Sequence, residues 1–204
     1  NMCMLIHHPA NAEPFTREEF EDFHARSPHG FGAMWRTPLG ELHSRKGLMR
    51  SGESWQLYRS LIANGCPEMV LHWRYRTAGP VNEANCHPIE VPGTRVLMMH
   101  NGAMIGPSTS TKSDSVVFAE SVMPDVIRAG DWSVRHPEMT PYLERQFGGN
   151  RLILWDQDEA TPVIVGEDTG LWWKGRWMSN TYAWTVPNEA MPRREPKFDW
   201  HRYA

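Results

Sequence analysis

Cysteine is scarce in this sequence of 204 residues, and long apolar runs are missing. The three cysteines, Cys3, Cys66 and Cys86, are too few and too scattered for a disulfide framework, and no pair has the Cys-x-x-Cys spacing of a zinc site. No apolar stretch approaches the roughly 20 residues that cross a bilayer, and residues 2–6 are too short for a signal peptide. We therefore expect a cytoplasmic protein with neither a membrane segment nor a bound metal.

Charge and phosphate-binding motifs argue against two further classes of protein. The formal net charge of −3 gives no electrostatic reason to expect nucleic acid as a partner. A glycine-rich loop with a lysine, which would bind nucleotide phosphates, is also missing. The ten tryptophans and twelve methionines are more than usual, and they either fill the core or form an apolar surface for a partner.

The pattern of apolar residues predicts one domain with both helices and strands. No repeat, linker or break in composition divides residues 1–204, although residues 187–204 form an irregular tail rich in Pro, Arg and Trp. Thr16 and Glu19 form a capping box at the start of a helix. The expected helices cover residues 17–26, 53–63, 113–123 and 139–147. The expected strands lie at residues 3–7, 29–36, 41–47, 68–75, 96–100, 151–155, 162–166 and 177–180. Because strands come in neighbouring pairs, this order favours an α+β layered fold.

Several residues have side chains that can carry chemistry, and each also has an ordinary structural explanation. A lone cysteine such as Cys3 is most often a small buried apolar residue. The pair Asn101-Gly102 is typical of a turn, and Asp114 is a favourable charge at a helix N-terminus. Arg74 lies within an apolar strand, where a guanidinium requires an anionic or carbonyl partner.

Taken together and in order, these segments resemble the class II glutamine amidotransferases, whose catalytic domain is an N-terminal nucleophile hydrolase. Cys3 follows a methionine. The likeness then continues through His72-x-Arg74-Tyr75-x-Thr77-x-Gly79, Asn85-Cys86-His87-Pro88, His100-Asn101-Gly102, and Ser113-Asp114 with Val117-Phe118. It runs from Cys3 to about residue 122, and residues 175–180 resemble a late strand of the stand-alone members.

The resemblance implies a four-layer α/β/β/α sandwich of two antiparallel sheets, and a reaction that needs no cofactor. The Cys3 thiolate attacks the side-chain amide of glutamine, forms a thioester and releases ammonia, and water then releases glutamate. The base is the α-amine of Cys3 itself. The Asn101 side-chain amide and the Gly102 backbone N–H are the implied oxyanion donors.

The resemblance also assigns the residues that bind glutamine. Arg74 holds the α-carboxylate by a two-pronged contact, with Thr77 adding a hydroxyl, and Asp114 accepts the α-ammonium. Tyr75 and His87 complete the pocket, His87 as support for its wall rather than as a base.

Two departures from the family pattern lie at the rim of this pocket, and the start of the chain is a third difference. Arg76 replaces a residue that is commonly small, and Ala78 stands where some relatives have histidine. We interpret Asn1 as a remnant of expression and Met2 as the natural start, whose removal exposes Cys3. A chain that keeps both residues has an amide in place of the amine and no base.

Three functions stay open from the sequence. The first is a glutaminase that passes ammonia to a separate synthetase chain. Its contact with that chain is expected in the Trp-rich later half and at tail residues that are equally explained as a solvated surface: Arg193, Arg194, Lys197, Trp200 and Arg202. The second is hydrolysis of another γ-glutamyl amide without an acceptor. The third is a non-catalytic glutamine-binding module, if Cys3 stays capped.

Overall fold

The computed structural model describes residues 2–10, 12–65, 68–104, 106, 108–128 and 133–187. The tail predicted for 187–204 is therefore described only at residue 187. The five tail residues proposed to contact a partner lie outside the described residues, as do Asn1 and Cys66. Within the described part of the chain, no helix combines the length and apolar character needed to cross a membrane.

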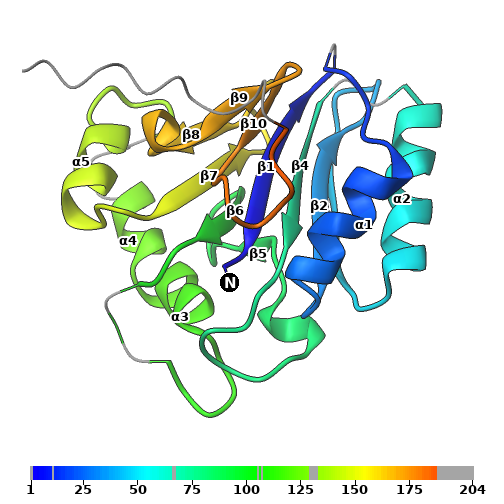
Figure 1. Cartoon of the computed structure of the whole chain (residues 1–204). Helices are drawn as coiled ribbons and strands as arrows, with labels where there is room; N and C mark the ends of the chain where they lie inside the picture. Colours follow the sequence, from blue (N-terminus) through cyan, green and yellow to red (C-terminus); the bar gives the residue numbers. More distant parts are fainter. Residues whose placement is uncertain are drawn as a thin grey trace, which may run out of the picture.

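Two antiparallel sheets form the centre of the molecule (Figure 1). The larger has the strand order β3-β2-β4-β1-β10-β9, and the smaller has the order β5-β6-β7-β8. The strands of the larger sheet are β1 Met4–Pro9, β2 Phe31–Arg36, β3 Leu42–Leu48, β4 Glu68–Trp73, β9 Leu171–Trp173 and β10 Arg176–Met178. The strands of the smaller sheet are β5 Ile89–Glu90, β6 Val96–Asn101, β7 Arg151–Asp156 and β8 Val163–Val165.

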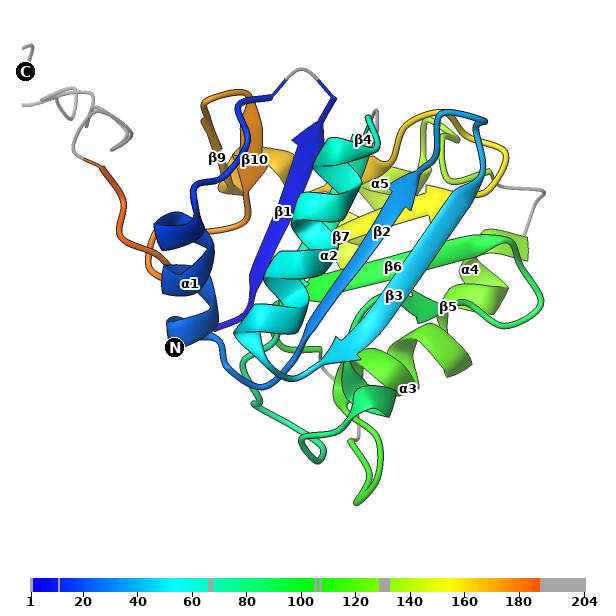
Figure 2. The same cartoon turned by 90° about the vertical axis from the view of Figure 1, so that its right-hand side faces the viewer.

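Helices cover the outer face of each sheet. Helices α1 (Arg17–Arg26) and α2 (Ser51–Ala63) lie on the larger sheet, as Figure 2 shows from their side. Helices α3 (Asp114–Ser121), α4 (Met123–Arg128) and α5 (Met139–Gln146) lie on the smaller sheet (Figure 1). Two short 3-10 turns, Glu83–Asn85 and Glu167–Thr169, complete the regular structure. This is the α/β/β/α arrangement of two antiparallel sheets expected from the sequence.

Three apolar clusters hold the four layers together, because side chains alternate across each strand. On β1, Met4 and Ile6 pack against α1 and α2, whereas Leu5 joins the cluster between the two sheets. That central cluster has members from both sheets: Leu5, Met34, Val70, Leu97, Met99, Ile153, Trp155 and Trp177. A third cluster fills the space between the smaller sheet and its helices. β1 therefore runs through the interior, with apolar contacts on both faces.

Local signals in the sequence account for several helix ends. The capping box is present, since Glu19 N–H donates to the Thr16 hydroxyl and Thr16 N–H donates to the Glu19 carboxylate. The expected helix over residues 113–123 is divided, because α3 ends before Val122 and a second helix begins at Met123. Pro124 lies directly after this break, in the first turn of α4, where the missing N–H of proline is tolerated.

The core position of Trp73 gives a test of this packing. Trp73 is fully buried and contacts the rings of Phe20, Phe23 and Phe31. Trp73→Ala should lower the free energy of unfolding by about 3–5 kcal/mol, because it leaves a cavity under both helices. Trp172→Ala is the matched control, since Trp172 is 48% exposed and its loss should change the same quantity by less than about 1 kcal/mol. Urea titration followed by circular dichroism measures both, and equal losses would contradict the assignment of this core.

Candidate active site

Strand pairing brings Cys3 beside Arg74 and Tyr75. β1 and β4 are antiparallel with Met4 opposite Trp73, so the residue before β1 lies next to the residues after β4. β6 of the other sheet ends at Asn101, and α3 begins at Asp114. The segments singled out in the sequence therefore meet at one end of the two-sheet sandwich, near the marked N-terminus in Figure 1.

A small cavity collects nearly all of the predicted site residues. Its lining consists of Cys3, Arg74, Tyr75, Thr77, Ala78, His87, His100, Gly102, Ser113, Asp114 and Ser115. Of the eight site residues expected from the sequence, Asn101 alone is missing from this lining, although both of its neighbours belong to it. The cavity volume is about 20 Å³, which is room for about one water molecule. An amino acid can enter only if a wall segment moves.

The sulfur of Cys3 is held by the backbone of Tyr75. Tyr75 N–H donates to Cys3 Sγ at 3.3 Å, and the thiol lies 3.5 Å from Tyr75 O as a donor. Burial raises the pKa of the Cys3 thiol to about 11, and the contact with Tyr75 and the charge of Arg74 oppose this only in part. With Met2 still attached, Cys3 is therefore a neutral thiol near pH 7.

Arg74 finds carbonyl partners in its own loop. Its Nη1 donates to Pro80 O at 2.8 Å and its Nη2 donates to Ala78 O at 2.9 Å, and the residue is only 3% exposed. Each Nη carries two hydrogens, so one N–H on each stays available to a carboxylate. Gly79 completes this loop at φ +67°, and a Cβ there would lie 2.7 Å from the backbone nitrogen of Ser113.

Asp114 is bonded to backbone at the start of α3. Its Oδ2 accepts from Met104 N–H and its Oδ1 accepts from Ser115 N–H, both at 2.9 Å. The Ser113 hydroxyl caps the helix by accepting from Val116 N–H. Asn85 accepts from Ser113 N–H at 2.6 Å, so the Asn-x-His-Pro segment is fixed to the same helix start.

Asn101 is buried just behind the cavity lining. Its Nδ2 is placed 2.7 Å from Ser179 Oγ, while its Oδ1 has no hydrogen-bond partner among the described residues. The Asn180 side chain donates to Cys3 O at 2.9 Å. Ser179 and Asn180 were not singled out as site residues from the sequence, because their only signal was the general likeness of residues 175–180 to a late strand.

Two buried histidines, His87 and His100, line the site, and a third, His72, packs against His87. The ring centroids of His72 and His87 are 4.1 Å apart, and those of His87 and His100 are 6.5 Å apart. Burial lowers the pKa of all three imidazoles, that of His72 to about 3, so they are neutral at pH 7. Among the described residues, no group of three or more His, Cys, Asp or Glu side chains is arranged to hold a metal ion.

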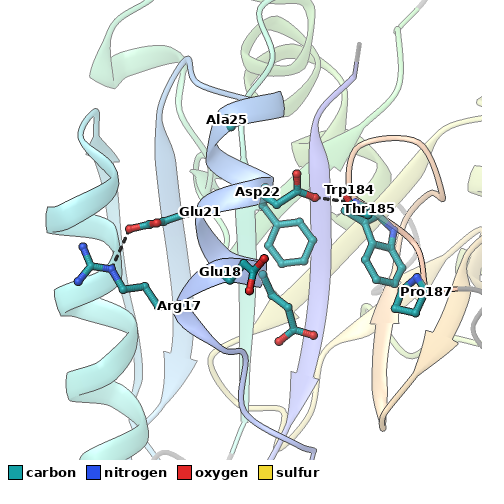
Figure 3. Close-up of a pocket in the computed structure, with 10 residues that line it drawn as sticks. Arg17, Glu18, Glu21, Asp22, Ala25, Trp184, Thr185 and Pro187 are labelled. Atoms are coloured by element: carbon teal, nitrogen blue, oxygen red, sulfur yellow. Dashed lines mark hydrogen bonds and ion pairs between the residues drawn. The ribbon is translucent and has the colours of Figure 1, made fainter.

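A larger groove lies elsewhere, along α1 and residues 184–187 (Figure 3). Its volume is about 750 Å³, and its lining combines the acidic side chains of α1 with Phe23 and Trp184. Figure 3 shows the Arg17–Glu21 ion pair on its edge. None of the predicted site residues lines this groove, so its size alone does not make it a catalytic site.

The raised pKa of Cys3 predicts slow alkylation of the chain that keeps Met2. A pKa near 11 against an ordinary value near 9.0 leaves roughly 100-fold less thiolate at neutral pH. The rate of carbamidomethylation at Cys3 should rise about tenfold per pH unit between about pH 8 and pH 10. Mass spectrometry of the Cys3 peptide measures this rate, with glutathione in the same tube as an unperturbed thiol. A plateau near pH 9 would contradict the prediction.

Comparisons with known proteins support the fold of this chain and do not identify a close relative. No protein-family model matches the chain, and no curated protein matches it. Several solved structures are similar, and two of them illustrate the likeness. One is the glutamine phosphoribosylpyrophosphate amidotransferase from B. subtilis complexed with ADP and GMP, with a TM-score of 0.54 and 15% identity over 86% of this chain and 41% of that chain. The other is the allosteric regulatory enzyme of purine biosynthesis, with a TM-score of 0.51 and 14% identity over the same shares.

The matched part of these structures fits the two-sheet arrangement described above. This chain spans about two-fifths of the length of both, and at such low identity the likeness concerns the fold alone. The chain therefore has a fold of two antiparallel sheets between layers of helices that is similar to the fold of these two structures.

Proposed function

We propose that this chain is a class II glutamine amidohydrolase that acts through a Cys3 thioester and delivers ammonia to a separate synthetase chain. The observation that carries the proposal is the shared cavity. Cys3, Arg74 and Asp114 come from three distant parts of the sequence and line the same small space. A thiol, a cation and a carboxylate in one cavity match the amide, the α-carboxylate and the α-ammonium of free glutamine.

The first chemical step needs a base for the partly buried thiol. A pKa near 11 leaves little thiolate at neutral pH, and the three neighbouring imidazoles have lowered pKa values and assist only weakly as bases. In a chain that begins at Cys3, the free α-amine lies beside the sulfur by covalent geometry. It takes the S–H proton as Sγ bonds to the amide carbon, and the C=O electron pair moves onto oxygen.

The second step expels ammonia and forms the thioester. The tetrahedral oxyanion accepts from Gly102 N–H and the Asn101 amide. The protonated α-amine of Cys3 then gives its proton to the leaving nitrogen, and the C–N bond breaks. Gly102 has φ +150°, and a Cβ there would lie 2.2 Å from Asn150 Oδ1, so only glycine fits at this turn. Water then attacks the thioester with the amine again as base, and glutamate leaves.

Substrate selection rests on the two charges opposite the thiol. Arg74 has one free N–H on each terminal nitrogen for the α-carboxylate, and Thr77 adds a hydroxyl from the same loop. Asp114 accepts the α-ammonium, while Tyr75 and His87 close the walls. Because the cavity holds about one water in this conformation, glutamine binding has to displace part of the loop over residues 75–80 or the segment at Met104.

The central test compares two forms of the chain. A protein that begins at Cys3 should release ammonia and glutamate from glutamine, whereas the form that keeps Met2 should be at least about 100-fold slower, because its thiol has no amine base. Intact mass confirms each start, and a coupled glutamate dehydrogenase assay measures turnover. Cys3→Ala is the control and should be inactive.

Other outcomes of this test would replace the proposal. Turnover of substituted γ-glutamyl amides but not of glutamine would make the chain a γ-glutamyl amide hydrolase. Glutamine binding that is unchanged by Cys3→Ala, with no ammonia release from the processed chain, would make it a binding module.

The charges of Arg74 and Asp114 predict how fast substrates with a blocked α-amine or α-carboxylate react. N-acetylglutamine lacks the ammonium and leaves Asp114 unpaired, so its kcat/KM should fall by about 100-fold or more relative to glutamine. An α-amide in place of the carboxylate should cause a similar loss at Arg74. In Asp114→Asn, the preference for glutamine over N-acetylglutamine should shrink, while the preference against the α-amide stays. Equal losses of both preferences would contradict the assignment.

A further inference from the structure

In the present orientation of the Asn101 side chain, Ser179 has more hydrogen-bond donors around it than its hydroxyl oxygen can accept. Ser179 Oγ receives three donors: Leu5 N–H at 3.0 Å, Asn101 Nδ2 at 2.7 Å and Asn180 Nδ2 at 3.3 Å. A hydroxyl oxygen has two lone pairs, so three donors exceed its capacity. The hydroxyl proton itself has only Met4 Sδ at 3.9 Å, a weak acceptor.

The oxygen end of the Asn101 amide has the opposite problem, because no donor from the described part of the chain reaches it. Asn101 Oδ1 is buried and has no donor among the described residues. An unpartnered buried acceptor is costly, and it stands beside a hydroxyl whose proton has no good acceptor. Both faults have the same origin, which is the orientation of one side-chain amide.

Turning the Asn101 amide by half a turn removes the surplus of donors at Ser179 and replaces the unpartnered acceptor by an unpartnered donor. Oδ1 then lies about 2.7 Å from Ser179 Oγ, the present distance of Nδ2, and accepts the hydroxyl proton. The two lone pairs of Ser179 are left for Leu5 N–H and Asn180 Nδ2. Asn101 Nδ2 moves into the buried position that had no partner, so it becomes a donor whose acceptor is not supplied by the described protein.

We propose that Ser179 is a positioning residue whose hydroxyl fixes the Asn101 amide with Nδ2 free for the substrate oxyanion. This inference rests on the proposed function and adds a residue to it. Without that hydroxyl, either end of the amide can face the reacting carbonyl, and the oxygen end repels the oxyanion.

The same residue also ties this donor to the nucleophile. Ser179 N–H donates to Leu5 O at 2.9 Å, and Leu5 N–H donates to Ser179 Oγ, so both backbone groups of Leu5 are bonded to one residue. Leu5 is two residues from Cys3, whose carbonyl accepts from Asn180 Nδ2. The distance between the sulfur and the Asn101 amide is therefore set by residues 179–180, immediately after β10.

A double-mutant cycle in the chain that begins at Cys3 tests the inference. Ser179→Ala should lower kcat for glutamine by about 10- to 100-fold, less than the loss of a complete oxyanion donor, and change KM by less than about threefold. In an Asn101→Ala background, Ser179→Ala should lower kcat by less than about threefold, because no amide is left to orient.

Ser54→Ala is the matched control for this cycle. Ser54 is also fully buried, but its hydroxyl donates to Arg50 O at the start of α2, so its removal should leave kcat within about twofold. Circular dichroism and urea midpoints confirm folding of every variant. If Ser179→Ala does not fold, Ser179→Cys replaces it, since a thiol has nearly the same volume and is only a weak donor.

The outcomes separate this inference from the function on which it rests. Equal kcat losses from Ser179→Ala in both backgrounds, or a loss expressed only in KM, would show a merely structural serine and overturn the inference alone. A parent chain that begins at Cys3, folds and releases no ammonia from glutamine would overturn the proposed function and this inference together.

Discussion

The antiparallel pairing of β1 with β4 fixes the position of the Cys3 sulfur, and the rest of the site depends on that position. Met4 lies opposite Trp73, so the sulfur meets the backbone of Tyr75 directly beyond the paired residues. A shift of this register by one residue would turn Leu5 away from the cluster between the sheets and Met4 away from the helices. The apolar pattern of β1, buried on both faces, therefore fixes the strand that positions Cys3, and the bond to Tyr75 fixes the sulfur itself.

Burial decides the charge states of the thiol and of the histidines at this site. The same desolvation that raises the pKa of Cys3 lowers the pKa of the histidines behind it, so neither a thiolate nor an imidazolium is ready at neutral pH. Arg74 and Asp114 are bonded to backbone groups, which fixes their positions beside a cavity with room for about one water molecule. A new α-amine at Cys3 would supply the proton acceptor that this arrangement lacks.

Signals that act over a few residues were sufficient to predict much of this molecule. The Thr16–Glu19 capping box, the Ser113 cap and the apolar spacing of α2 each depend on neighbours in sequence, and the structure has all three elements. The short strands β5 and β9 were missed, because two or three residues give no readable alternation. Ser179 was missed for a different reason. Its hydrogen bond to Leu5 joins residues that are 174 positions apart in the sequence. The residues next to a serine that follows a short strand do not indicate such a distant partner.

The two sheets supply different halves of the site, and this division explains why residues far from the cavity matter to it. The larger sheet carries Cys3 and Arg74, whereas the smaller sheet and its helices carry Gly102 and Asp114. The relative position of the halves is set by the apolar cluster between the sheets and by the Ser179–Asn101 contact, which crosses from one sheet to the other. Apolar packing resists separation of the sheets but has no preferred direction, so it tolerates small sliding movements. A hydrogen bond between buried groups is directional, and the one between Ser179 and Asn101 restrains the sliding that packing alone permits.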